Sequence, residues 1–187
     1  MNTSLQRPLV ALLALTLPLG ASAARYTSIP NPATGAHFNF RVTFIPVPGQ
    51  VSAVNAQLDL DPAHPGKASG LVQVPLGALG TGIGLRDQHA RNYLKVADFP
   101  AATFKLAQLS GIGSLPVGQS VSGQVSGVFS LAGISQPLRA PITALRSASG
   151  QIAVMTTFNV TLRDFGIRIP GADARTDVQV NFTLAPQ

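Results

Sequence analysis

The residues best suited to chemistry gather in one stretch, residues 85–104, of a chain that is otherwise poor in charge. Arg86 and Arg91 lie close to His89 there, and arginine guanidinium groups match the geometry of phosphate and carboxylate oxygens. These three side chains are therefore candidates to bind a phosphate or carboxylate group of a ligand. A structural interpretation is favoured over this one, in which Arg86, Asp87 and His89 fix the segment to a neighbouring strand.

The signatures of an enzyme or of a metal site are missing. The histidines, His37, His64 and His89, have neither the i, i+2 nor the i, i+4 spacing of paired metal ligands. The chain has no Cys, which excludes a thiolate nucleophile, a Cys-ligated metal and a disulfide. It also has no Gly-x-Ser-x-Gly nucleophile motif. We expect a protein without catalytic residues, metal or cofactor.

One amphipathic helix is expected in residues 85–104. Its apolar residues fall near helical spacing: Ile83, Ala90, Tyr93, Leu94 and Ala97. Pro100 forces the chain out of the helix. A single polar helix in a β-rich chain favours a lid or plug. Tyr93 then either lines the mouth of a cavity or packs beneath the helix.

The rest of the chain alternates apolar and polar residues, as strands do. In the first strand the alternation runs from Phe38 through Phe44, and residues 46–49 are expected to form the turn that follows. Short connections favour sequential hairpins, so we predict an all-β fold, an eight-stranded antiparallel barrel with the helix inserted between strands. The eight predicted strands are residues 37–45, 51–60, 69–76, 103–109, 119–131, 138–145, 152–162 and 177–184.

Small residues occupy several positions on the apolar strand faces where a filled core would need bulk: Ala56, Gly123, Gly127, Ala140 and Ala144. If these faces point inward, the barrel is under-filled and keeps an elongated cavity. The alternative is that Gly123 and Gly127 only ease the bending of their strand. The distribution of small residues over several strands favours the cavity.

The N-terminus has the pattern of a secretory signal peptide, with Arg7, an apolar run at residues 9–19 and the cleavage motif Ala21-Ser22-Ala23. We predict a signal peptide at residues 1–23 and a single domain at residues 24–187. The product would be periplasmic or secreted.

The charge of the predicted mature chain is basic but dispersed. Loss of Arg7 leaves 12 basic against 7 acidic residues, a net charge of +5. No run of Lys and Arg exists, and export separates the protein from nucleic acid, so we reject a nucleic-acid partner. Transient attraction to anionic lipid headgroups at a membrane surface is the more natural use of this charge.

Three stretches carry a family resemblance. The first runs from Thr81-Gly82-Ile83 through Leu85-Arg86-Asp87-x-His89 and Tyr93-Leu94-x-Val96 to Phe99-Pro100-x-x-Thr103-Phe104. The second is Phe129-x-Leu131-x-Gly133-Ile134-x-x-Pro137, and the third is Arg163-Asp164-Phe165-Gly166-Ile167-x-Ile169-Pro170. Together they resemble the YceI-like family of exported bacterial proteins, which are lipocalin-like barrels that bind polyisoprenoid lipids. Before Thr81 the chain departs from the family, because Tyr26-Thr27-Ser28-Ile29-Pro30 replaces the usual opening motif.

The resemblance implies that the barrel holds one long isoprenoid chain, a polyprenyl compound or an isoprenoid quinone, for transport, storage, sequestration or stress protection. The protein would act as a monomer or homodimer. Tyr93 joins Arg86, His89 and Arg91 as a candidate at the headgroup or mouth, and Phe165 and Ile167 would close one end. The expected cavity wall consists of Phe38, Phe40, Phe104, Phe129, Phe158 and Phe182.

Three other functions stay open at this stage. Alternation does not say which face is inside, so a small outer-membrane barrel fits the same strands. A filled β-domain with a structural or adhesion role also fits. A hydrolase would require His89 to take part in turnover.

Overall fold

A computed structural model describes residues 23–31 and 34–187. The predicted signal peptide, residues 1–23, lies almost entirely outside the described residues, and strand β1 begins at Ala24. The described strands are β1 (Ala24–Ile29), β2 (Gly35–Val42), β3 (Ile45–Val51), β4 (Asn55–Leu60), β5 (Ser69–Pro75), β6 (Ala101–Ser110), β7 (Ser120–Leu131), β8 (Ile134–Arg146), β9 (Ile152–Thr161) and β10 (Arg175–Pro186). The helices are α1 (Gly84–Tyr93) and the single 3₁₀ turns η1 (Pro65–Lys67), η2 (Leu76–Ala78) and η3 (Leu162–Phe165).

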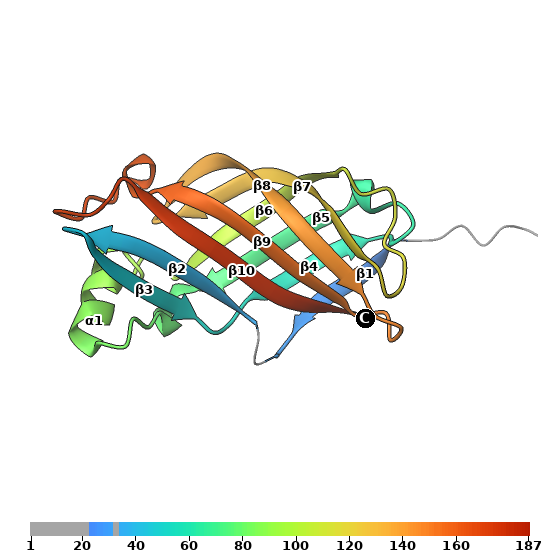
Figure 1. Cartoon of the computed structure of the whole chain (residues 1–187), viewed down its shortest axis with the longest axis horizontal. Coiled ribbons are helices and arrows are strands. Elements are labelled where there is room, and N and C mark those ends of the chain that lie inside the picture. The colour runs from blue at the N-terminus through green and yellow to red at the C-terminus, as the bar shows by residue number, and fades with distance from the viewer. Residues whose placement is uncertain (1–22, 32–33) are drawn as a thin grey trace, which may run out of the picture.

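Eight of these strands close into an antiparallel barrel, which confirms the predicted fold class. Neighbours follow the order β1-β4-β5-β6-β7-β8-β9-β10, and β10 pairs back onto β1 (Figure 1). The closing register runs from Tyr26 opposite Pro186 to Ile29 opposite Thr183. Beyond the end of β1, β10 pairs instead with β2, so the β2–β3 hairpin prolongs the wall at one end.

The strands of the barrel differ from the predicted ones at the N-terminal side. Residues 46–49 are not a turn but part of β3, and the predicted strand at residues 51–60 is divided between β3 and β4. The turn lies earlier, at Thr43 and Phe44, whose φ values of 48° and 69° give the left-handed backbone of a two-residue hairpin. Phe44 is therefore exposed rather than on the face of Phe38. Pro46 and Pro48 are tolerated because β3 has a strand partner on one side only.

The second hairpin turn is also tighter than the sequence indicated. Ala132 and Gly133 alone connect β7 to β8, since Leu131 already pairs with Ile134. Gly133 has a φ of 81° and lies under the ring of Phe99, where a Cβ would come within 2.4 Å of the ring. Glycine is needed at this position for both reasons.

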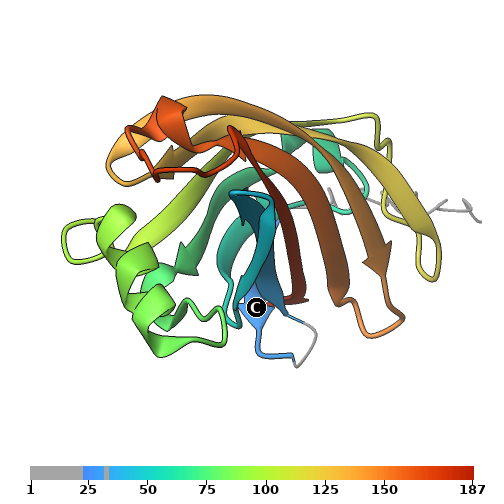
Figure 2. The same ribbon diagram turned by 60° about the vertical axis from the view of Figure 1, so that its left-hand side comes forward.

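Helix α1 is confirmed, but it is shorter and less amphipathic than predicted. It ends at Tyr93, well before Pro100, because Lys95 adopts the left-handed conformation with a φ of 52°. Ala90 and Leu94 turn towards the barrel, whereas Ile83 is exposed at the start of the helix. Figure 2 looks towards the end of the barrel where α1, the β2–β3 hairpin and the loop before β10 lie around the interior.

The apolar faces of the strands point inward and form two adjoining cores. The larger core includes Val125, Ile152 and Leu184, and the smaller one, nearer α1, includes Leu131, Phe165 and Ile167. Polar residues such as Gln57, Gln124 and Gln179 are exposed on the outside.

Candidate ligand-binding cavity

The barrel interior contains two adjoining apolar cavities. The closed-end compartment, of about 120 Å³, is lined by residues of β4 to β10, among them Phe104, Ala140 and Phe182. The helix-end compartment, of about 140 Å³, is lined by β2, α1, β9 and β10 and by the loop before β10. Five residues line both compartments, so the two spaces adjoin: Val74, Ala102, Phe129, Phe158 and Val180.

Phe129 lies between the two compartments and lines both. Its ring meets Phe158 edge-on, with 5.7 Å between centroids, and Phe165 edge-on at 5.4 Å. Phe165 is buried beside Phe129 and belongs to neither lining, whereas Ile167 lines the helix-end compartment. Edge-to-face pairs hold aromatic rings in defined orientations, so these contacts fix the orientation of the Phe129 ring between the two compartments.

Small residues contribute to the cavity in two different ways. Ala140 and Ala144 line the closed-end compartment, as expected of an under-filled wall. The space over Gly127 is taken by the Phe104 ring, and the space over Gly123 by the Ile112 side chain, each within 3 Å of where a Cβ would be. The two glycines therefore let larger side chains lie flat against the wall, and the alanines leave the free volume.

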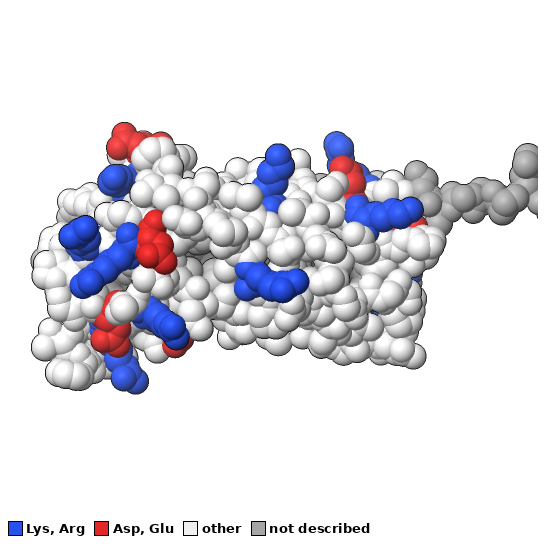
Figure 3. Space-filling view, turned by 90° about the horizontal axis from the view of Figure 1, so that it is seen from above, with Lys and Arg blue, Asp and Glu red and all other residues white. Residues whose placement is uncertain are grey.

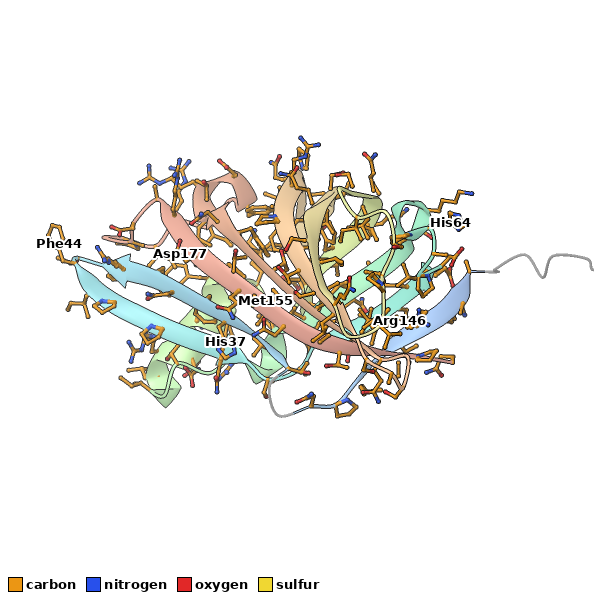
Figure 4. The ribbon with its side chains drawn as sticks, turned by 45° about the vertical axis from the view of Figure 1, so that its right-hand side comes forward. His37, Phe44, His64, Arg146, Met155 and Asp177 are labelled. Atoms are coloured by element: carbon orange, nitrogen blue, oxygen red, sulfur yellow. The ribbon has the colours of Figure 1, made fainter. Side chains whose placement is uncertain are left out.

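The closed end is sealed by two loops. Ile112 and Leu115 are buried there and line the cavity, and the N–H of Leu115 donates to the carbonyl of Pro62 (2.8 Å). In the same loop as Pro62, His64 Nδ1 donates to Asp61 Oδ2 (2.8 Å). His64 marks this end of the molecule in Figure 4, opposite Phe44.

The opposite end is bordered by α1, whose position is set by two polar contacts. The hydroxyl and the N–H of Thr81 donate to Asp87 Oδ1 at 2.5 and 2.6 Å, and Arg91 donates to the carbonyl of Leu79 at 3.0 Å. The hydroxyl of Thr81 is the main reason that the pKa of Asp87 is below its ordinary value, with smaller contributions from the N–H and the two arginines. Asp87 and Arg91 therefore tie the helix to the segment before it.

The predicted wall residues lie along this interior. Phe38 and Phe40 line the helix-end compartment, Phe104 and Phe182 line the closed-end compartment, and Phe129 and Phe158 line both. Of the predicted headgroup residues, Tyr93 lines the helix-end compartment. Arg86, His89 and Arg91 are in neither lining, and His89 is exposed.

Sequence reasoning missed one lining residue of a different chemical kind. Thr176 is inward-facing and 5% exposed, in phase with Val178 and Val180. The predicted last strand began at residue 177, two residues after β10 begins. Extending the predicted alternation from Val178 back by two residues would have placed Thr176 on the inward face of the strand.

Comparison with known proteins identifies the family. The profile of the YceI-like domain matches residues 28–185. The chain belongs to the YceI-like family. The YceI-like match includes the segment before Thr81, where the family's opening motif is absent. A UPF0312 protein of Vibrio cholerae is 26% identical over 179 residues, covering 89% of this chain and 90% of the relative.

Solved structures show the same YceI-like fold at low sequence identity. A polyisoprenoid binding domain from Saccharophagus degradans has a TM-score of 0.71 at 15% identity and covers 88% of this chain and 99% of that one. BcnA of Burkholderia cenocepacia has a TM-score of 0.68 at 13% identity, covering 80% and 95%. The YceI protein of Campylobacter jejuni has a TM-score of 0.57 at 18% identity, covering 75% and 85%.

Residues 23–31 and 34–187 contain no group of three or more His, Cys, Asp or Glu side chains placed to hold a metal ion. Within the same residues, no helix is long and apolar enough to cross a membrane.

Proposed function

We propose that this member of the YceI-like family binds a long-chain isoprenoid lipid, a polyprenyl compound or an isoprenoid quinone, inside its barrel. The observation that carries the proposal is the pair of adjoining compartments, whose linings contain no Lys, Arg, Asp or Glu among the described residues. An elongated apolar space suits an elongated apolar ligand. The similar domain from Saccharophagus degradans, described as polyisoprenoid binding, supports the same class of ligand.

The affinity would come from burial of the ligand. Each buried methylene contributes roughly 0.8 kcal/mol, so a few isoprene units exceed the several kcal/mol that ordering a ligand costs. Tight binding therefore needs no charged contact along the chain.

Binding without catalysis is favoured over the other functions that the sequence left open. His89 is exposed and lies outside both linings, which argues against its use in a hydrolase centred on the cavity. The free volume of the two compartments argues against a filled structural domain. The apolar faces point inward, whereas barrels of the outer membrane carry their apolar band on the outside.

The setting that we propose is the cell envelope, where the protein would transport, store or sequester the lipid. Strand β1 begins at Ala24, directly after the predicted cleavage site at residue 23. Figure 3 shows Lys and Arg spread along this face of the molecule, with Asp side chains among them, rather than a single basic patch.

Native mass spectrometry of the protein purified from the periplasm of a related host tests the proposal. We expect near-stoichiometric bound lipid, whose extracted masses step by isoprene units. The variant Ala140→Phe fills the closed-end compartment and should lose most of that lipid. Ala153→Phe adds the same bulk at an exposed position on β9 and should retain it. Bare polypeptide that takes up no added polyprenol or quinone would refute the proposal.

Transfer of the lipid would require contact with a membrane surface, and we propose the helix end for this contact. Phe44 is 90% exposed and Ile45 65% exposed at the tip of the β2–β3 hairpin, beside the exposed Arg41. Figure 4 shows Phe44 projecting beyond the hairpin. Ile83 and Leu85 are exposed at the start of α1, at the same end (Figure 1).

Vesicle co-sedimentation tests this contact. Phe44→Asn should reduce binding to vesicles that contain anionic lipid by several-fold. It should not lower the melting temperature, because asparagine tolerates the left-handed backbone at this turn better than phenylalanine. Val117→Asn removes an exposed apolar side chain at the opposite end and should bind like the wild type. Equal losses in the two variants would argue against the helix end.

A further inference from the structure

Thr176 carries an unpaired hydroxyl in a compartment whose lining is largely apolar. It is 5% exposed, and its Oγ1 is buried without a hydrogen-bond partner among the described residues. Its place in β10 is defined by pairing with Val160, and its neighbour Asp177, labelled in Figure 4, is exposed on the other face. Thr176 therefore faces the interior, where it lines the helix-end compartment.

An unpaired buried hydroxyl is costly. Leaving such a group without a partner destabilises the fold, whereas valine has nearly the same shape and avoids this penalty. A threonine hydroxyl in a strand usually finds a partner within the protein. Thr156, which lines the closed-end compartment, donates its hydroxyl hydrogen bond to the carbonyl of Pro141 (2.7 Å). Thr176 has no such partner among residues 23–31 and 34–187.

The surroundings of Thr176 restrict the partner it can take. The other polar side chains in the helix-end lining are His37 and Tyr93, and both lie at its exposed margin. No cationic side chain lines the compartment among the described residues, so an anionic headgroup would enter without a counter-charge. A charge buried in this way is strongly disfavoured, but a neutral oxygen is not.

We propose that Thr176 is the internal contact for the polar end of the ligand, and that this end is a single neutral oxygen group such as an alcohol, a phenol or a quinone carbonyl. The hydroxyl of Thr176 donates to that oxygen, or accepts from it when the oxygen carries a proton. The isoprenoid chain then extends past Phe129 into the closed-end compartment. This inference rests on the proposed function, because it assigns the direction and the headgroup of the same ligand.

The test compares Thr176→Val, Thr176→Ser and the wild type, all stripped of lipid. Three probes share one isoprenoid chain length: the alcohol, its phosphate ester and the hydrocarbon without a head. For the alcohol, Thr176→Val should weaken binding by about fivefold to tenfold, the loss expected for one hydrogen bond. Thr176→Ser keeps the hydroxyl and should restore binding, and the hydrocarbon should bind all three proteins alike.

The remaining outcomes separate the two proposals. Equal loss of alcohol and hydrocarbon in Thr176→Val would reduce Thr176 to a packing residue and overturn the inference while leaving lipid binding intact. A matching loss for the phosphate ester would overturn the restriction to neutral heads. Failure of the wild type to bind any probe would refute the proposed function itself.

A second readout needs no ligand. Because valine removes an unpaired polar group, lipid-free Thr176→Val should melt at the same temperature as the wild type or above it. A lower melting temperature would mean that the hydroxyl is already satisfied within the protein, which would also overturn the inference.

Discussion

Asp61 is a buried carboxylate in a protein with few charged residues. It accepts hydrogen bonds from His64 Nδ1 (2.8 Å) and from the N–H of Ala63 (2.9 Å). The hydrogen bond from His64 is the main reason that its pKa is below the ordinary value of 3.8, followed by that from Ala63, while burial acts in the opposite direction. The Asp-Pro-Ala-His string that holds these residues forms the loop at the closed end.

We predict that Asp61 makes the stability of the protein depend on acid. A carboxyl whose pKa is lower in the folded state stabilises the fold above the pKa of the unfolded chain, and this contribution is lost as the pH falls through the folded value. The melting temperature should therefore decrease as the pH is lowered below about 4.

The control for this prediction is Asp61→Asn. The variant should be less stable than the wild type at neutral pH and should lose less on acidification, as followed by circular dichroism from neutral pH to the acid range. A variant with the same acid profile as the wild type would assign the acid sensitivity to other carboxylates, such as Asp87, whose pKa is also lowered.

Among the elements, the six-residue strand β1 closes the barrel. It is paired on both sides, with β4 and with β10, and it thereby converts an open sheet into a barrel. Tyr26, at its centre, is 3% exposed and part of the larger core. The hydroxyl of Ser28 accepts a hydrogen bond from the N–H of Ala56 (2.9 Å). This contact gives the backbone amide of Ala56 in β4 a partner just beyond the last β1–β4 residue pair, Thr27 and Gln57.

We predict that Tyr26→Ala lowers the free energy of unfolding by about 3 kcal/mol, the usual cost of deleting a buried aromatic ring. Urea denaturation measures this difference, and hydrogen exchange should show faster exchange along the C-terminal part of β10, where β1 pairs. Tyr26→Phe keeps the ring and should stay within about 1 kcal/mol of the wild type. An unchanged unfolding midpoint in Tyr26→Ala would mean that β1 is not needed to close the barrel.

At the scale of the whole molecule, the proposed ligand would become part of the core. The wall residues of the two compartments lack van der Waals contacts on the side that faces the free volume. A bound apolar chain would supply those contacts. A ligand that binds only the folded state stabilises it in proportion to the logarithm of its concentration.

We predict that lipid-free protein melts at a lower temperature than the loaded protein. At a hundredfold excess over Kd the stabilisation is about 2.7 kcal/mol, which corresponds to a rise of roughly 5–10 °C for a domain of this size. Differential scanning calorimetry before and after extraction measures the shift. Ala140→Phe, with less room for ligand, should show a smaller one, and an equal shift in both proteins would place the ligand elsewhere.

The sequence by itself determined the class of fold and much of the proposed wall. Alternation through Phe104, Phe129, Phe158 and Phe182 placed these rings on one face of their strands, because side chains in a strand point to opposite faces in turn. The family motifs from Thr81 onward led to the same fold. Both signals are local, so they can be read from neighbouring residues.

Only the tertiary structure decided how the barrel closes and where its polar contact lies. β1 pairs with residues at the far end of the chain, and no local pattern encodes such a partner. The turn at Thr43 and Phe44 was hidden because alternation continues through it, although the backbone there is left-handed. Thr176 became a candidate contact only when the register of β10 placed its hydroxyl inside the barrel, without a partner in the part of the chain that the structure describes. That placement depends on the packing of all the surrounding strands.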